Sequence, residues 1–126
     1  MVQKGLFYTK EHEWAKIEGK TAIIGITDYA QHALGELTFI ELPTIGKQLK
    51  VRDTVATMES SKAASDVYAP VAGKVIEVNT ELESKPELIN DDCYDTGWIC
   101  KIEISGDEEV TDLMDSSKYE IFLKEL

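Results

Sequence analysis

The stretch that decides the fold covers residues 55–71 and reads Val-Ala-Thr-Met-Glu-Ser-Ser-Lys-Ala-Ala-Ser-Asp-Val-Tyr-Ala-Pro-Val. Its centre, residues 59–65, holds small residues around a single lysine, Lys62. β-Branched and apolar residues alternate on both sides of this centre, which is typical of strands. The pattern predicts a β-hairpin with Lys62 at or beside its tip, where small neighbours leave the side chain open to an enzyme. An ordinary exposed surface lysine is the alternative, and the hairpin pattern alone does not exclude it.

Length and composition are those of one globular domain. The chain has 126 residues, of which 43% are hydrophobic and 29% are charged. We therefore expect a single domain over residues 1–126, with one core. Uncharged runs such as residues 21–27 are strand-sized and too short to span a membrane. The first motif begins within a few residues of Met1, which leaves no room for a leader peptide. We therefore expect a cytoplasmic protein, with a chain that is already processed as the alternative.

The surface is predicted to be strongly acidic. Twenty-four acidic residues against 13 basic ones give a formal net charge of −11, and the acids are scattered along the chain. Such a surface repels nucleic acid and anionic membranes and favours encounters with electropositive protein clefts, although the same charge also serves solubility. We therefore expect protein partners, no nucleic acid and no membrane. The chain is also expected to be monomeric.

Residues that usually carry catalysis or bind metals are few and dispersed. Six residues separate Cys93 from Cys100, which matches no common zinc or redox spacing. Cys100 falls on the apolar side of an alternating strand and is expected to be buried, whereas Cys93 is assigned no role. His12 and His32 are far apart and have no partners at metal-ligand spacing, so we expect no metal site. A phosphate-binding glycine loop and a nucleophile elbow are also absent. A fold this small with one exposed lysine suits a carrier protein, so we expect a carrier and not an enzyme.

Outside the hairpin, the patterns predict short strands and a few helical turns. The predicted extended segments are residues 6–8, 14–18, 21–27, 37–42, 51–59, 67–71, 74–79 and 98–104. A short helix is predicted to be capped by Asp28, with Gln31 completing a capping box, and to end at Gly35. Another helical turn is predicted to begin at Ser84, which is paired with Glu87.

A C-terminal helical segment is predicted over about residues 107–126, where apolar residues recur at helical spacing and acids crowd the start.

The elements together predict an all-β-dominated fold. Its expected form is a flattened barrel or sandwich of short strands with short helices, on which the C-terminal segment packs.

The hairpin sequence resembles the lipoyl-lysine hairpin of the glycine cleavage system H-protein family. It has the pattern Glu-Ser-x-Lys-Ala-x-Ser-Asp, followed by Ala-Pro-Val-Ala-Gly-Lys-Val. Other segments of the family pattern occur in the same order, at residues 8–14, 24–31, 34–36, 39–43, 85–90 and 97–99. Cys93 departs from the pattern, because the family often has proline there. The resemblance covers nearly the whole chain and implies a fold of the lipoyl-domain (barrel-sandwich hybrid) type.

The resemblance implies that Lys62 carries lipoate in amide linkage. Lysine suits this attachment because its amine acylates to a stable amide, which removes the charge and leaves a long flexible tether. The lipoyl arm would accept an aminomethyl group when glycine dehydrogenase (P protein) decarboxylates glycine. It would then offer that group to the aminomethyltransferase (T protein) and be reoxidised by lipoamide dehydrogenase (L protein). These enzymes and the lipoate-attaching enzyme are the expected partners. Glu59 is expected to be recognised by the attaching enzyme, with an ordinary solvated acid at the end of a strand as the alternative.

The resemblance also implies a cleft in which the loaded arm rests. The arm would end in a labile primary ammonium, which carboxylates can hold while the domain excludes water. Asp66 and Glu13 match family positions near such a cleft, and Glu11 stands beside them where the family varies. Burial of four methylenes of the tether would contribute roughly 3 kcal/mol, less the entropy of immobilising it. An ordinary solvated acid is the alternative for each of the three residues.

Other functions stay open at this point. The chief alternative is an H-like relay protein that donates its lipoyl group to other lipoate-dependent complexes. A biotin carrier shares the hairpin, but its usual Met-Lys-Met is replaced here by Ser61-Lys62-Ala63. An interaction module whose lysine is never modified is a third alternative, which the extent of the resemblance disfavours.

Overall fold

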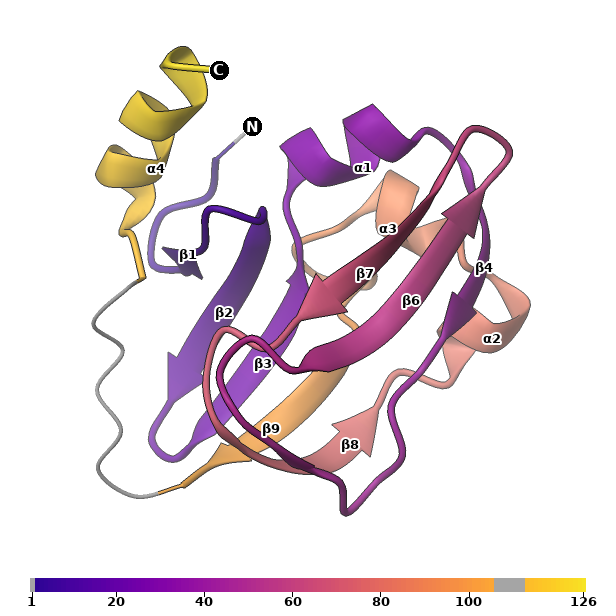
Figure 1. The fold of residues 1–126 in the computed structure, drawn as a ribbon, viewed down its shortest axis with the longest axis vertical. Helices are drawn as coiled ribbons and strands as arrows, with labels where there is room; N and C mark the ends of the chain where they lie inside the picture. The colour runs from indigo at the N-terminus through magenta and orange to yellow at the C-terminus, as the bar shows by residue number, and fades with distance from the viewer. Residues whose placement is uncertain (1, 106–112) are drawn as a thin grey trace.

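The structure contains two antiparallel sheets. The computed structural model describes residues 2–105 and 113–126, and these residues form nine strands and four helices (Figure 1). The larger sheet contains, in spatial order, β1 (Phe7–Tyr8), β2 (Glu13–Glu18), β3 (Thr21–Ile26), β9 (Cys100–Ile104), β8 (Gly73–Val78) and β5 (Gln48–Leu49). The smaller sheet contains β4 (Leu37–Glu41), β6 (Thr54–Ser60) and β7 (Ala64–Tyr68). No helix among the described residues is long and apolar enough to cross a membrane.

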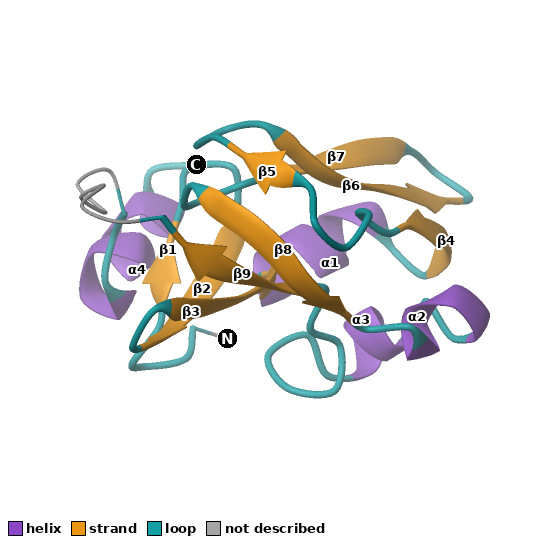
Figure 2. Cartoon of the chain, turned by 90° about the horizontal axis from the view of Figure 1, so that it is seen from below, coloured by secondary structure: helices purple, strands orange, loops and turns teal. Residues whose placement is uncertain are grey.

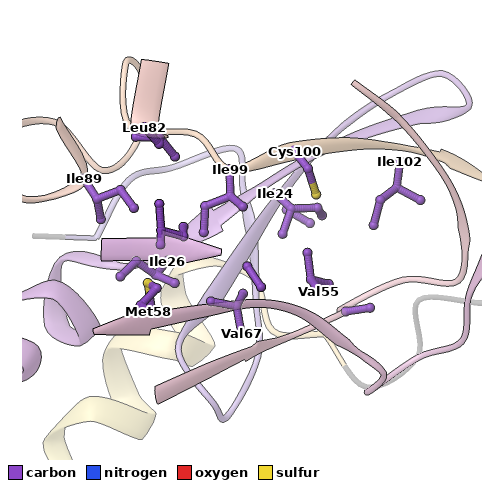
Figure 3. Close-up of a cluster of buried hydrophobic side chains, with 14 of the residues drawn as sticks. Ile24, Ile26, Val55, Met58, Val67, Leu82, Ile89, Ile99, Cys100 and Ile102 are labelled. Carbon is purple, nitrogen blue, oxygen red and sulfur yellow. The ribbon is translucent and has the colours of Figure 1, made fainter. Parts of the chain in front are cut away.

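The two sheets form separate layers around a common core. Figure 2 shows β6 and β7 in one layer, with β8 and β9 in the other. Buried side chains from both layers belong to one cluster, which includes Val55 and Val67 from the smaller sheet and Ile24, Cys100 and Ile102 from the larger. Figure 3 shows Cys100 projecting from β9 toward Val55. The predicted sandwich of short strands is therefore confirmed.

Cys100 lies in this core, as the strand alternation predicts. Its exposed fraction is 0%, and burial raises the pKa of its thiol to about 12. Burial likewise raises the pKa of the Cys93 thiol to about 12. Because the thiolate is the reactive form, we expect a thiol-reactive dye to label both cysteines only as fast as the protein opens. Denatured protein provides the control, and rapid labelling of Cys100 in native buffer would contradict its position in β9.

The hairpin strands are shifted relative to the prediction. β6 begins at Thr54 and not at residue 51, because residues 50–53 form a turn in which the Asp53 carboxylate accepts the Lys50 backbone N–H (2.8 Å). β7 begins at Ala64 and not at residue 67. Its pairing with β6 therefore extends to the turn that holds Lys62.

The helix predicted after residue 27 is present, but Asp28 is not its cap. In α1 (Asp28–Leu34), the Thr27 side chain accepts the Ala30 backbone N–H, so Thr27 is the N-cap. Thr27 has the extended backbone that an N-cap requires (φ −78°, ψ 167°), whereas Asp28 is already helical. Gln31 donates to the Asp28 carboxylate and forms no capping box.

Gly35 ends α1, as predicted. Its φ of 79° and ψ of −165° describe a conformation that essentially only glycine adopts. Asn90, in α3 (Leu88–Asp91), stabilises this end, because its amide donates to the Gly35 carbonyl and to the Gln31 side chain. The Asn90 side-chain carbonyl accepts the Leu37 N–H, so one side chain joins α1, β4 and α3.

The prediction that a helical turn begins at Ser84 is wrong. Ser84 is the last residue of α2 (Glu81–Ser84), and its hydroxyl donates to the Glu81 carbonyl. This local bond to its own helix competes with capping of a following one. Lys85 then leaves the helical conformation (φ −135°, ψ 66°), and Glu87 precedes α3 without a side-chain cap bond.

The C-terminal helix starts later than predicted. α4 covers Ser116–Lys124, and the Asp115 side chain caps it by accepting the Lys118 N–H. Met114, which the spacing places in the helix, instead pairs with Tyr8 through two backbone hydrogen bonds of 2.7 and 2.8 Å. This pairing with β1 outweighs the helical spacing at residue 114. Residues 107–112 of the predicted helix lie outside the described residues.

Candidate functional site

The hairpin tip is a tight turn built around Ser60. The Ser60 N–H donates to the Ala63 carbonyl (2.8 Å), which leaves Ser61 and Lys62 as the central residues of the turn. The Ser60 hydroxyl oxygen accepts the N–H groups of Lys62 and Ala63, each at 3.2 Å. Neither central residue has a positive φ, so this is not one of the hairpin turns that favour glycine or asparagine. A serine side chain stabilises the turn instead.

Lys62 is exposed and lies beside the end of α1. A Cβ placed on Gly35 would come within 3.2 Å of Lys62 Cε, so the lysine side chain passes directly over that glycine. Figure 1 shows the tip of the β6–β7 hairpin next to the C-terminal end of α1. Within residues 2–105 and 113–126, the Lys62 amine has no hydrogen bond or ion pair. Acylation of this amine would therefore break no hydrogen bond or ion pair in the described part of the chain.

Glu59 is exposed near the end of β6. It pairs with Phe39 on β4 and with Ala64 on β7, and opposed residues in a sheet present their side chains on the same face. All three residues are exposed, so this is the outer face of the smaller sheet. An enzyme that binds Lys62 from this face would contact Glu59.

A cleft of about 260 Å³ lies between α1, β7 and the loop that precedes β2. We call it the α1–β7 cleft. Tyr29, Ala30, Ala33 and Leu34 of α1 contribute most of its apolar lining, and His12 and Ser65 also line it. Three of its residues are the acids singled out from the sequence, Glu11, Glu13 and Asp66. The fold thus brings together acids from two segments that are far apart in the chain.

Glu13 is the most constrained of the three acids. Its exposed fraction is only 2%, one carboxylate oxygen accepts the Thr9 hydroxyl (2.5 Å), and the other accepts the Tyr68 backbone N–H (3.1 Å). Burial raises the pKa of Glu13 to about 7, against the opposing effect of these two hydrogen bonds. The carboxyl group therefore joins the loop before β2 to the end of β7, and it titrates near neutral pH.

This pKa makes the free energy of unfolding depend on pH. Glu13 has a pKa of about 7 in the folded protein, against an ordinary value of 4.5. Between these pH values the folded state binds more protons than the unfolded state. Stability therefore falls as pH rises from about 4.5 to 7, by up to about 3 kcal/mol.

We expect Glu13→Gln, which cannot ionise, to lose this part of the pH slope in denaturant unfolding measured between pH 4.5 and 8. The comparison concerns the slope, because the amide also changes the contacts with Thr9 and Tyr68. Glu103→Gln, at an exposed position on β9, should keep the wild-type slope. An unchanged slope in Glu13→Gln would show that burial does not raise the pKa.

Asp66 and Glu11 are exposed at the cleft. The Asp66 carboxylate accepts the Thr57 hydroxyl (3.0 Å) across the β6–β7 pair, which orients it. The backbone N–H of Glu11 donates to the Thr9 hydroxyl oxygen, while its carboxylate has no hydrogen-bond partner among the described residues. Carboxylates beside apolar α1 side chains match a ligand with an apolar stem and a cationic end.

A second and larger cavity, of about 410 Å³, shares Glu11 and Glu13 with the cleft. Lys10 and Arg52 also line it, and none of its lining residues belongs to α1 or to the hairpin tip. Two basic side chains make it less suited to an ammonium group. The α1–β7 cleft is therefore the better match for a cation, despite its smaller volume.

The sequence patterns did not point to His12, Tyr29 or Ser65 as cleft residues. His12 has a φ of 69°, and its ring lies 4.3 Å from that of Tyr29, measured between centroids. His12 lies between two acids that the resemblance singled out, and this position in the sequence is the feature that points to a place at the cleft. Whether its side chain faces the cleft depends on a left-handed backbone that no local pattern predicts.

The chain is similar to proteins of one family over nearly its whole length. The family model described as glycine cleavage H-protein matches residues 6–126. The glycine cleavage system H protein of Carboxydothermus hydrogenoformans is 50% identical, over 99% of this chain and 96% of that protein. The probable glycine cleavage system H protein of Pyrococcus abyssi is 53% identical, over 99% and 94%. The crystal structure of a glycine cleavage system H protein from Mycobacterium marinum superposes with a TM-score of 0.89 at 32% identity, covering 98% of this chain and 99% of that one.

Proposed function

The chain belongs to the glycine cleavage H-protein family, and from this premise we propose that Lys62 is the residue to which its lipoyl group is attached. Members of this family are lipoyl carriers that shuttle intermediates among the P, T and L proteins. The position of Lys62 supports the assignment. It lies in an exposed turn, its neighbours are small, and its amine has no partner among the described residues.

The attaching enzyme is proposed to recognise Glu59 along with the lysine. Both residues are exposed, and only Ser60 and Ser61 separate them. The Ser60 hydrogen bonds give the turn a defined shape without involving either the Glu59 carboxylate or the Lys62 amine. An enzyme can therefore bind both groups without opening the hairpin.

The α1–β7 cleft is proposed to hold the end of the loaded arm. When attached, the lipoyl group supplies a dithiolane that accepts the aminomethyl group produced from glycine. The apolar side chains of α1 would contact the arm and exclude water from its end. Asp66 and Glu13 would each accept a hydrogen bond from the ammonium, and Glu11 would add negative charge.

The chain is proposed to act as a single carrier domain over residues 1–126, without catalytic residues of its own. Its partners would be glycine dehydrogenase, the aminomethyltransferase, lipoamide dehydrogenase and the lipoate-attaching enzyme. A net charge of −11 favours encounters with electropositive clefts on such enzymes. The cytoplasmic location and the monomeric state stay predictions.

The test combines modification with activity. Peptide mass mapping of native protein should find lipoate on Lys62 and on no other lysine. The lipoylated protein, mixed with glycine dehydrogenase, should support exchange of labelled bicarbonate into the carboxyl group of glycine. Biotin at Lys62, or lipoate on another lysine, would contradict the assignment. Absence of exchange above the unlipoylated control, together with transfer of lipoyl to an acyltransferase domain, would favour the relay function.

A further inference from the structure

Three segments of the chain meet at the hydroxyl of Tyr119. This residue of α4 is fully buried, and its ring stacks on that of Tyr8 with centroids 4.5 Å apart. Its hydroxyl oxygen lies 2.8 Å from His12 Nδ1 and 2.8 Å from the Thr27 hydroxyl oxygen. His12 belongs to the loop before β2, and Thr27 caps α1. One hydroxyl therefore joins the C-terminal helix to two other segments.

Both of these segments form walls of the α1–β7 cleft. His12 lines the cleft between Glu11 and Glu13, while Thr27 begins the helix that supplies the apolar lining. The Thr27 N–H also donates to the His12 carbonyl (3.0 Å), so the two walls are joined by a backbone hydrogen bond as well. The separation of the acids from α1 thus depends on how His12 and Thr27 are held.

The conformation of His12 requires such support. Its φ of 69° lies in the left-handed region, which is costly for a residue other than glycine and persists where surrounding contacts determine it. The His12 N–H donates to the Thr9 carbonyl (3.1 Å), and Tyr119 holds the imidazole. Because Glu11 and Glu13 flank this residue, a change in its backbone would shift the segment that carries both acids relative to α1.

We propose that Tyr119 is a positioning residue for the α1–β7 cleft, holding His12 and Thr27 so that the loop acids face α1. The inference rests on the proposed function only in that this cleft receives the loaded arm. It gives α4, which contributes no residue to the cleft lining, a part in protecting the arm. Burial also lowers the pKa of His12, so the ring adds no cation near pH 7 to a cleft that must hold one.

Two tyrosine variants separate positioning from packing. Tyr119→Phe keeps the ring that stacks on Tyr8 and removes only the hydroxyl. Tyr8→Phe keeps the same stack and removes a hydroxyl whose hydrogen bonds, among the described residues, go only to Gln3. The second variant is therefore a matched control for loss of a tyrosine hydroxyl in the same ring pair.

The first measurement is amide hydrogen exchange of the unloaded protein. In Tyr119→Phe we expect the His12 and Thr27 amides to exchange at least about five times faster relative to the Ile102 amide of β9, which reports global opening. In Tyr8→Phe this ratio should stay at the wild-type value. A general loss of stability would speed exchange of the Ile102 amide as well, so it would not by itself raise this ratio. Equal ratios in both variants would overturn the positioning role.

The second measurement is the lifetime of the loaded protein. We expect Tyr119→Phe to shorten it about five-fold or more and Tyr8→Phe to leave it unchanged. If wild-type protein protects its loaded arm no better than a lipoyl-lysine hairpin peptide, the cleft proposal fails, while the exchange ratios still decide whether Tyr119 holds the loop. If wild-type protein does protect the arm and both variants match it, the inference is wrong.

Discussion

Lys62→Arg is expected to abolish lipoyl attachment and to reduce bicarbonate exchange to the level of unlipoylated protein, while the protein stays folded. Arginine keeps the positive charge, but its guanidinium stays protonated and does not replace the lysine amine in amide formation. The turn should survive, because its hydrogen bonds involve Ser60 and backbone groups and not the Lys62 side chain. We expect the free energy of unfolding to change by less than about 0.5 kcal/mol.

Intact mass after incubation with lipoate and the attaching enzyme measures attachment, and denaturant unfolding checks the fold. Lys74→Arg, at an exposed position on β8, is the matched control and should be lipoylated like the wild type. Exchange activity retained by Lys62→Arg, or lipoate on a different lysine, would show that the attachment site lies elsewhere. A large loss of stability would show that the Lys62 side chain supports the turn.

The parts of the fold that could be predicted from the sequence are those that one local pattern decides. Alternation around residues 59–65 predicts the hairpin, and alternation in β9 predicts the burial of Cys100, which the structure confirms. Gly35 ends its helix as predicted, because the backbone there needs glycine. In each case the physical cause lies within a few residues of the predicted feature.

Predictions were wrong where neighbouring residues compete or where a distant segment intervenes. Thr27 and Asp28 both suit an N-cap, and the extended backbone at the end of β3 gives the position to Thr27. Met114 has helical spacing, yet it pairs with Tyr8, more than 100 residues earlier in the chain. Local periodicity contains no information about such a partner.

The candidate site also has features that could be predicted from the sequence and features that could not. The resemblance singled out Glu11, Glu13 and Asp66, and the structure places all three at one cleft. Burial of Glu13 and its pKa of about 7 depend on packing against the end of β7, where the Tyr68 N–H meets its carboxylate. No pattern within residues 8–14 predicts that contact.

Segments outside the hairpin have clear structural roles. The Trp14 ring covers Gly25 so closely that a Cβ there would lie 2.5 Å from it, and Trp14 Nε1 donates to the Cys93 carbonyl (3.0 Å). Asn90 joins α1, β4 and α3 beside Lys62. These residues are needed to build the domain, so their presence alone does not separate glycine cleavage from lipoyl relay. The bicarbonate exchange assay is therefore required to separate the two functions.

Neutral replacement of the cleft acids is expected to shorten the lifetime of the loaded protein strongly. A hydrogen bond to a charged group contributes about 1.5–3 kcal/mol, so Asp66→Asn should shorten the lifetime by roughly 10- to 100-fold. Glu13→Gln should have an effect of the same order, since a bound ammonium favours the charged carboxylate and lowers its pKa. Release of the carried group at pH 7.5 gives the lifetime, and denaturant unfolding checks that each variant is folded.

Two further acids provide the comparison for this prediction. Glu11→Gln should have a smaller effect, because the Glu11 carboxylate is exposed and has no partner among the described residues that orients it. Glu103→Gln, on β9 and outside the cleft lining, should have none. Wild-type lifetimes in both Asp66→Asn and Glu13→Gln would remove the cleft assignment. Equal shortening in Glu103→Gln would mean that the overall negative charge, and not the position of Asp66 and Glu13, protects the arm.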